Sequence, residues 1–168
     1  MPFEKYVNQA FLSVVESAIN TLSFSKLETG IAVFEKIAFL ISRINYDMAL
    51  DPANFAASGD SIAYGISTSD QTTNIGLDNS AILDRNSILR YDLGTAASGF
   101  YITTPFEKNF ADLPGGGLLV PPNPLYIFAK GTALGSVVTV QARLFYTVIK
   151  MKVDEYWELV EMRRMIGV

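Results

Sequence analysis

VVTVQARLFYTVIKM, residues 137–151, is the stretch that decides the fold class of this chain. Apolar and polar side chains alternate along it, and alternation with a period of two residues is typical of a half-buried β-strand. At about 3.3 Å per residue the stretch would span roughly 50 Å, more than twice an ordinary strand. It therefore predicts one wall of a large β-sandwich. Its apolar face is formed by Val138, Val140, Ala142, Leu144, Tyr146 and Val148, and its more polar face by Thr139, Gln141, Arg143 and Thr147.

Several shorter segments upstream also have the pattern of strands, and turn-forming residues separate them. Ser, Thr, Asn, Asp and Gly fill the region from residue 53 to residue 105, which is typical of loops that join short strands. No βαβ rhythm and no internal repeat is present, so we expect an antiparallel sandwich of about eight strands. The predicted strands lie at residues 18–25, 36–47, 61–67, 87–93, 100–104, 118–120 and 125–130.

Both ends of the chain have helical patterns. Near the N-terminus, apolar residues that include Phe11 recur every three or four positions, which predicts an amphipathic helix within residues 1–17. That segment either covers the core or forms an arm that docks on a neighbour or a lipid surface. Near the C-terminus, Asp154 is expected to cap a helix with Glu155 and Glu158 in its first turn.

The composition excludes most familiar kinds of active site. The 168 residues suit one domain, and 49% of them are hydrophobic, which is enough for a dry core. The chain contains no Cys and no His, so zinc sites, disulfides, thiol nucleophiles and a His general base cannot form. We therefore expect a protein that is not an enzyme and that holds no cofactor and no metal.

Charge and hydropathy exclude further classes. The net charge is −4 and the basic residues are scattered, with only Arg163 and Arg164 adjacent, so no basic arm is present to neutralise a phosphate backbone. We expect no direct binding of nucleic acid. The apolar runs are shorter than the roughly 20 residues that a membrane helix requires, and no secretory signal pattern opens the chain.

Three motifs invite a chemical reading, and each has a simpler structural one. Gly115, Gly116 and Gly117 lack the Lys-Ser/Thr of a phosphate-binding loop, so a hinge or close-packed loop is favoured. Glu158 and Glu161 share a helix face that reads as a solvated surface. Four Asp and Asn residues offer calcium ligands, but their spacing matches no defined calcium loop and turn formation explains them. They are Asp78, Asn79, Asp84 and Asn86.

Other residues are candidates for contacts between subunits. Arg143 lies in the middle of the polar face of the long strand, where it either pairs with an acidic residue of a neighbouring strand or reaches an interface. Tyr156 and Trp157 open the C-terminal helix, where they either pack on the base of the sandwich or anchor a subunit contact. The candidate assembly residues are Phe11, Arg143, Tyr156, Trp157, Arg163 and Arg164.

Two long segments carry a resemblance to a known family. LSFSKLETGIAVFEKIAFLISRINYD (residues 22–47) and NPLYIFAKGTALGSVVTVQARLFYTVIKMKVDEYWELVE (residues 123–161) resemble the single jelly-roll capsid proteins of tailless icosahedral viruses of archaea and thermophilic bacteria, the sphaerolipovirus-like group. In that family a last long strand of the RLFYTVIKM kind leads into a short DEYWELVE tail. The resemblance implies a single jelly-roll domain over residues 1–168, with an N-terminal helix or arm at 1–17 and a C-terminal helix at 153–168.

The function that the resemblance implies is structural. The protein is expected to be a subunit of an icosahedral capsid, made in the host cytoplasm, that assembles through lateral contacts into the capsomers of the virion. Its expected partners are copies of itself and, as further candidates, a second capsid protein and an internal viral membrane. The haloarchaeal members are strongly acidic, so the modest charge of this chain favours a host that is not salt-loving.

One alternative remains open from the residues themselves. An oligomeric β-sandwich that binds carbohydrate or a receptor would carry exposed aromatic side chains with Asp and Asn at one loop end. Tyr64 and Tyr91 are the candidates for such a cluster. A jelly-roll enzyme of the cupin type is strongly disfavoured, because the chain has no His to hold a metal.

Overall fold

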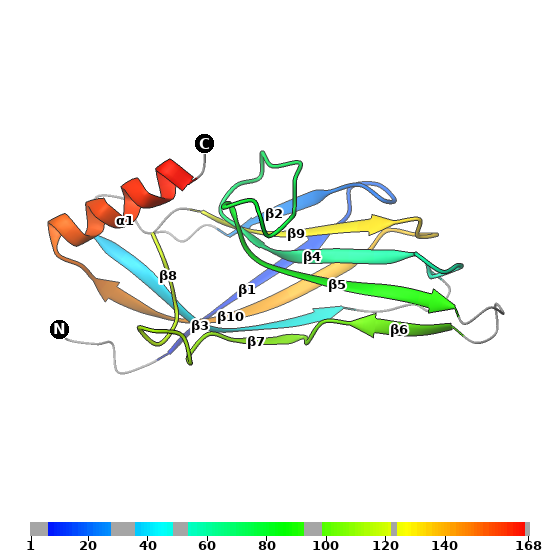
Figure 1. Ribbon diagram of the computed structural model, residues 1–168, viewed down its shortest axis with the longest axis horizontal. Coiled ribbons are helices and arrows are strands. Elements are labelled where there is room, and N and C mark those ends of the chain that lie inside the picture. The colour runs from blue at the N-terminus through cyan, green and yellow to red at the C-terminus, as the bar shows by residue number, and fades with distance from the viewer. Residues whose placement is uncertain (1–6, 28–35, 49–53, 93–98, 122–123, 167–168) are drawn as a thin grey trace.

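The computed structural model describes residues 7–27, 36–48, 54–92, 99–121 and 124–166, with side chains as far as residue 161. Two five-stranded antiparallel sheets pack against each other, and one helix follows the last strand (Figure 1). The elements are β1 (Asn8–Val15), β2 (Ser23–Leu27), β3 (Ile37–Met48), β4 (Ser61–Ser67), β5 (Ile82–Asp92), β6 (Gly99–Thr103), β7 (Glu107–Asn109), β8 (Leu118–Val120), β9 (Leu125–Thr132), β10 (Thr139–Lys150) and α1 (Val153–Ile166).

The order of the strands is that of a jelly roll. Sheet A runs β1-β10-β3-β7, with β8 also paired to β3, and sheet B runs β2-β9-β4-β5-β6. Early strands therefore pair with late ones: β1 with β10, β2 with β9, and β3 with β7 and β8, around the β4–β5 hairpin. A long antiparallel ribbon that is wound up in this nested way is the double Greek key of the jelly roll. The predicted all-β fold class is confirmed.

The long strand forms where the alternation predicted it. β10 spans Thr139–Lys150, and Val140, Ala142 and Leu144 turn inward while Gln141 and Arg143 lie on the outside. Beyond Leu144 both faces are partly buried, and the register with β3 shifts between Phe145 and Tyr146. Ser42 of β3 is left without a partner at that point, so β3 bulges there.

The bulge allows apolar residues at odd and at even positions of β3 to face the same core. Phe39 and Ile41 face the core on one side of Ser42, and Ile44 and Tyr46 face it on the other. Without the extra residue, a strict alternation would send one of these pairs to the outer face. The hydroxyl of Ser42 donates a 3.2 Å hydrogen bond to the carbonyl of Phe145, which holds the bulge in place.

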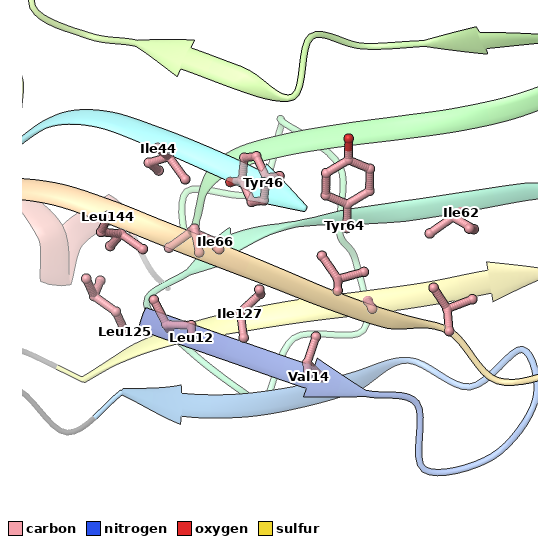
Figure 2. Packing of buried hydrophobic residues seen from close by; sticks show 14 of the residues in the cluster. Leu12, Val14, Ile44, Tyr46, Ile62, Tyr64, Ile66, Leu125, Ile127 and Leu144 are labelled. Atoms are coloured by element: carbon pink, nitrogen blue, oxygen red, sulfur yellow. The ribbon is translucent and has the colours of Figure 1, made fainter. Parts of the chain in front are cut away.

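The core fills the space between the two sheets. Figure 2 shows Leu12 and Val14 of β1 and Leu144 of β10 packed against Ile66 of β4 and Ile127 of β9. Each of these residues is at most 6% exposed, so the apolar faces of these strands are buried in the core. The outer faces of the sheets and their open edges consequently remain for contacts with other molecules.

The predicted N-terminal helix is wrong. Residues 8–15 form β1, in which Leu12 and Val14 are buried while Phe11 and Val15 are exposed. A spacing of three or four apolar residues also satisfies a short strand whose outer face is apolar, and pairing along the whole of β10 favours the strand. Residues 1–6, the rest of the predicted helix or arm, lie outside the described residues.

The other predicted elements differ mainly at their ends. The strand expected at 18–25 lies at Ser23–Leu27, and the one expected at 87–93 begins earlier, at Ile82. At the C-terminus α1 covers Val153–Ile166, but Asp154 lies in its first turn and is not its cap. Instead Glu155 accepts a 3.3 Å hydrogen bond from the amide of Lys152, as in the returning half of a capping box.

Candidate assembly surface

The outer face of sheet A gathers aromatic and charged side chains from the first and last strands. The register places them in three rows that run across the sheet. The first row is Ser13, Gln141 and Asp47; the second is Phe11, Arg143, Asn45 and Glu107; the third is Gln9, Phe145, Arg43 and Asn109.

Phe11 and Arg143 form the centre of this surface. They lie directly opposite each other on β1 and β10, and the guanidinium carbon of Arg143 is 4.6 Å from the centroid of the Phe11 ring. Phe11 remains 64% exposed in spite of this contact. Of the two predicted roles of Arg143, pairing with an acidic residue is not seen: no salt bridge within the described part of the chain involves it.

A second aromatic–cation pair lies beside the first. The guanidinium carbon of Arg43 is 4.2 Å from the centroid of the Phe145 ring, and its Nη1 is 3.6 Å from Oε1 of Glu107. Both partners of the ion pair are largely exposed, so it adds little to the stability of the fold. The Arg43 side chain thus contacts both an aromatic ring and a carboxylate, so this part of the surface is amphipathic.

The surface is contoured and balanced in charge. Two shallow grooves, of about 470 and 440 Å³, follow the rows. The first is bordered by Phe11, Asp47 and Arg143, and the second by Arg43, Glu107 and Phe145. Two Arg and two carboxylates thus share one face, so a second protein surface with the same mixture can approach without net repulsion.

The predicted contact residues of the C-terminal helix have different environments. Tyr156 is fully buried, whereas the neighbouring Trp157 is 52% exposed, with their ring centroids 5.8 Å apart. Tyr156 is therefore enclosed within the fold, whereas Trp157 is placed to reach another molecule. The side chains of Arg163 and Arg164, the remaining candidates, lie outside the described residues.

A buried polar cluster, which the sequence did not predict, links the two sheets. Tyr46 of β3 donates a 2.7 Å hydrogen bond to Oδ2 of Asp84 on β5, and the side-chain amide of Asn86 donates to the same oxygen at 2.6 Å. Nζ of Lys108 on β7 lies 4.0 Å from the other carboxylate oxygen. Burial, together with the Asp84 charge, raises the pKa of Tyr46 well above its ordinary value, so the phenol remains a donor.

Glu16 is a second buried carboxylate that sequence reasoning missed. It follows β1 and is 3% exposed. Its two oxygens accept hydrogen bonds from the amides of Gly131, at 2.5 Å, and Val138, at 3.0 Å. The carboxylate therefore joins the end of β1 to the end of β9 and to the residue before β10, which is a structural role. A lone Glu after an apolar run gives no sequence signal for this.

The structure separates the residues considered as calcium ligands. Asp84 and Asn86 turn into the sandwich, whereas Asp78 bonds to Asn74 at an exposed position of the β4–β5 connection. Within the described residues, no group of three or more Asp and Glu is arranged to hold a metal.

The triple glycine forms a loop that leads into β8, and only its last member is closely packed. Gly115 and Gly116 have positive φ angles of 94° and 79°, which few other residues adopt. A Cβ on Gly117 would lie 2.8 Å from the carbonyl oxygen of Ile41.

The predicted aromatic cluster of a binding module is wrong in one of its two members. Tyr64 is fully buried in the core, with its ring centroid 5.2 Å from that of Tyr46. Its position on β4 alternates with Ile62 and Ile66, so the same pattern that predicted a strand also placed it inside. Tyr91 is 48% exposed and packs on Phe100 of β6.

In the described part of the chain, no helix is long and apolar enough to cross a lipid bilayer.

Comparison with known proteins gives a likeness in structure only. No family model matches the sequence, and no curated protein matches it. Among solved structures, the chain is similar to VP1 of the Trichodysplasia spinulosa-associated polyomavirus, with a TM-score of 0.43 and 8% sequence identity. The similarity covers 87% of this chain and 97% of that one. The assignment of the jelly roll rests on the strand order and register described above.

Proposed function

We propose that this protein is a structural subunit of an icosahedral viral capsid, and that lateral contacts between subunits cover the outer face of sheet A. The observation that carries the proposal is the Phe11–Arg143 pair on that face, which leaves Phe11 64% exposed. Val15, on the same face of β1, is 54% exposed. Large apolar side chains that stay exposed on one face of a sheet are a feature of contact surfaces.

The chemistry of the outer face fits a contact between proteins. Aromatic residues and Arg are enriched at the centres of protein interfaces, where they carry a large share of the binding energy. Here two guanidinium groups are already stacked on aromatic rings, so little side-chain entropy is lost when a neighbour covers them. Full burial of an aromatic side chain contributes about 1.5–3 kcal/mol, which makes Phe11 a natural anchor.

The rest of the molecule supports a mechanical role. The buried carboxylates of Glu16 and Asp84 each accept hydrogen bonds that join distant segments of the fold. The core between the sheets is continuous, and the Tyr46–Asp84 bond ties one sheet to the other. A sandwich whose two sheets are joined by a continuous core and by buried hydrogen bonds suits a structural subunit of a shell.

The partners of the proposed function are copies of this chain first, with a second capsid protein and an internal viral membrane as further candidates, all within a virion. Exposed Trp157 on α1 offers a second contact at the end of the sandwich. The alternative of a carbohydrate- or receptor-binding module is weakened because Tyr64 is buried.

Assembly of the purified protein tests the proposal. Phe11→Ser removes the exposed ring without touching the core, and Leu77→Ser is the matched control, since Leu77 is 70% exposed in the β4–β5 connection. We expect the wild type and Leu77→Ser to form capsomers or shells, visible by sedimentation and negative-stain imaging. Phe11→Ser should remain a folded, smaller species. A wild-type protein that stays monomeric and binds glycans saturably would contradict the capsid function.

A further inference from the structure

Strand β6 is an open edge of sheet B. It pairs with β5 on one side, and within the described residues no strand pairs with its other side. All five residues of β6 are exposed. Among them Phe100, Tyr101 and Ile102 are 41%, 43% and 52% exposed, so the edge is apolar as well as unpaired.

The register shows which backbone groups point outward from this edge. The amide of Arg90 on β5 donates to Asp60, and its carbonyl accepts from Gly59, so both groups point away from β6. Tyr101 lies opposite Arg90, and in an antiparallel pair of this kind the groups of both residues point away from each other. The N–H and C=O groups of Tyr101, and by alternation those of Gly99 and Thr103, are therefore directed outward.

Nothing in β6 protects this edge in the ways that natural sheets use. Exposed edges are commonly blunted by Lys, by Pro within the strand or by a bulge. The sequence of β6 is GFYIT, without charge or Pro, and its pairing with β5 is regular. The charged residues on the adjoining part of β5, Arg90 and Asp92, form an ion pair with each other at 2.9 Å. The edge is thus neutral and free to pair.

From this pattern we infer that β6 pairs with the β6 strand of a second copy of the chain, antiparallel and about a twofold axis at Tyr101. The occupant is a second copy of the strand. When two GFYIT strands pair antiparallel about Tyr101, aromatic Phe100 meets β-branched Ile102 and no like charges face each other. Gly99 then lies opposite Thr103, and Tyr101 opposite Tyr101. Each of the three facing pairs exchanges two backbone hydrogen bonds. An isologous contact of this kind closes a dimer with one sheet running through both subunits.

The side chains fit the same arrangement. Phe100 and Ile102 lie on one face of β6, where Phe100 already packs on Tyr91, with ring centroids 5.6 Å apart. In the dimer, Phe100 of one copy becomes the neighbour of Ile102 of the other across the axis. Cross-strand aromatic and β-branched pairs of this type stabilise sheets. Tyr101 lies on the other face, with its ring centroid 5.2 Å from that of Phe55.

In the proposed capsid, this dimer is one more contact between subunits. Its role in a shell rests on the proposed function, but the formation of the dimer does not. The edge and the outer face of sheet A are different surfaces, so they can be disrupted separately. Phe11→Ser should abolish larger assemblies while the β6 dimer persists. Changes in β6 should remove the dimer whether or not the protein forms a shell. Failure of one proposal therefore leaves a result distinct from failure of the other.

The test uses the whole protein and two substitutions. Ile102→Lys places two like charges beside the axis, and Tyr101→Pro removes an outward amide that β5 does not use. Leu77→Lys is the control, a new Lys at an exposed position in the β4–β5 connection. By sedimentation equilibrium on the Phe11→Ser background, we expect each β6 variant to raise the dimer dissociation constant at least 10-fold, and Leu77→Lys to leave it unchanged.

Hydrogen exchange identifies the surface directly. The amides of Tyr101 and Thr103 should be protected in the dimer and should lose protection on dilution, whereas those of Phe100 and Ile102, which face β5, should stay protected. A monomeric protein at high concentration would overturn the inference. So would a dimer in which Ile102→Lys binds as tightly as the wild type, or in which Tyr101 and Thr103 exchange freely. Ile102→Lys keeps the test decisive if Tyr101→Pro fails to fold.

Discussion

Tyr46 and Asp84 join the two sheets of the sandwich through a 2.7 Å hydrogen bond that is closed off from water. A buried carboxylate requires donors, and Asp84 has two on one oxygen, Tyr46 and Asn86. The bond is therefore both a link between layers and a condition for keeping the charge of Asp84 inside.

Removal of this link should destabilise the fold. Tyr46→Phe keeps the ring and deletes the donor, which leaves Asp84 short of one hydrogen bond, so we expect a loss of about 1–3 kcal/mol in the free energy of unfolding. Urea denaturation followed by circular dichroism measures it. Tyr91→Phe, at a half-exposed position, is the control and should change stability by less than about 0.5 kcal/mol. Equal effects of the two substitutions would contradict the role of the bond.

Stability should also fall at alkaline pH. The pKa of Tyr46 is raised in the folded state, first by burial and then by Asp84, while in the unfolded chain it is near 10.0. Above that pH the unfolded state loses a proton that the folded state retains, so the free energy of unfolding falls as pH rises, by up to about 1.4 kcal/mol per pH unit. Denaturation between pH 8 and pH 11 should show the decline, and Tyr46→Phe should make it shallower.

Glu16 should be among the most sensitive charged positions. Glu16→Ala removes the acceptor for the amides of Gly131 and Val138 and leaves both buried without a partner. We expect a loss of about 3–5 kcal/mol, the combined cost of two charge-assisted hydrogen bonds. Glu107→Ala is the comparison, because that exposed ion pair should contribute less than about 1 kcal/mol. Thermal unfolding that ranks the two the other way would refute the assignment.

A methyl group at Gly65 should be tolerated poorly. A Cβ there would lie 2.0 Å from the carbonyl oxygen of Asp84 and 2.9 Å from the Phe128 ring, so β4 and β5 would have to separate. Gly65→Ala should therefore lower the free energy of unfolding by roughly 1–3 kcal/mol or more, the range of overpacked cores. At Gly115, where a Cβ meets nothing within 4 Å, the same substitution carries only the strain of its positive φ angle. Comparison of the two unfolding midpoints separates contact from strain.

The C-terminal helix should show a division between neighbours. Tyr156→Ala opens a cavity where the side chain is fully buried, so it should lower stability by about 3–5 kcal/mol. Trp157→Ala, at a half-exposed site, should leave stability nearly unchanged and weaken assembly. A truncation after Lys152 combines both effects. If Trp157→Ala assembles like the wild type, then α1 contributes only to the fold.

The positions of the strands were easier to predict from the sequence than the pairing between them. Alternation located β4 and β10 closely, because a strand with one buried face shows its period in any short window. β1 was misread in part because Phe11 is apolar on the outer side, where polar residues are usual. That exception is itself informative, because Phe11 is also at the centre of the proposed contact surface.

The candidate site was predicted as single residues and not as an arrangement. Phe11 and Arg143 were both candidates, but their contact depends on the register between β1 and β10, which no local pattern contains. Asp84 was considered as a loop ligand, and only the strand pairing with Ile66 turns it inward. The contacts that turn single residues into a site depend on the register between strands that are distant in the sequence, and the pairing of all the strands sets that register.

The pairing of β1 with β10 also constrains the synthesis of the protein. Within sheet A, β1 has β10 as its neighbour, so the first strand waits on the ribosome without that partner until residue 150 has emerged. The Phe11–Arg143 pair consequently exists only on chains translated that far. If shells form through this pair, then incomplete chains lack the contact by which they would be incorporated. Assembly would then exclude chains whose translation stopped early.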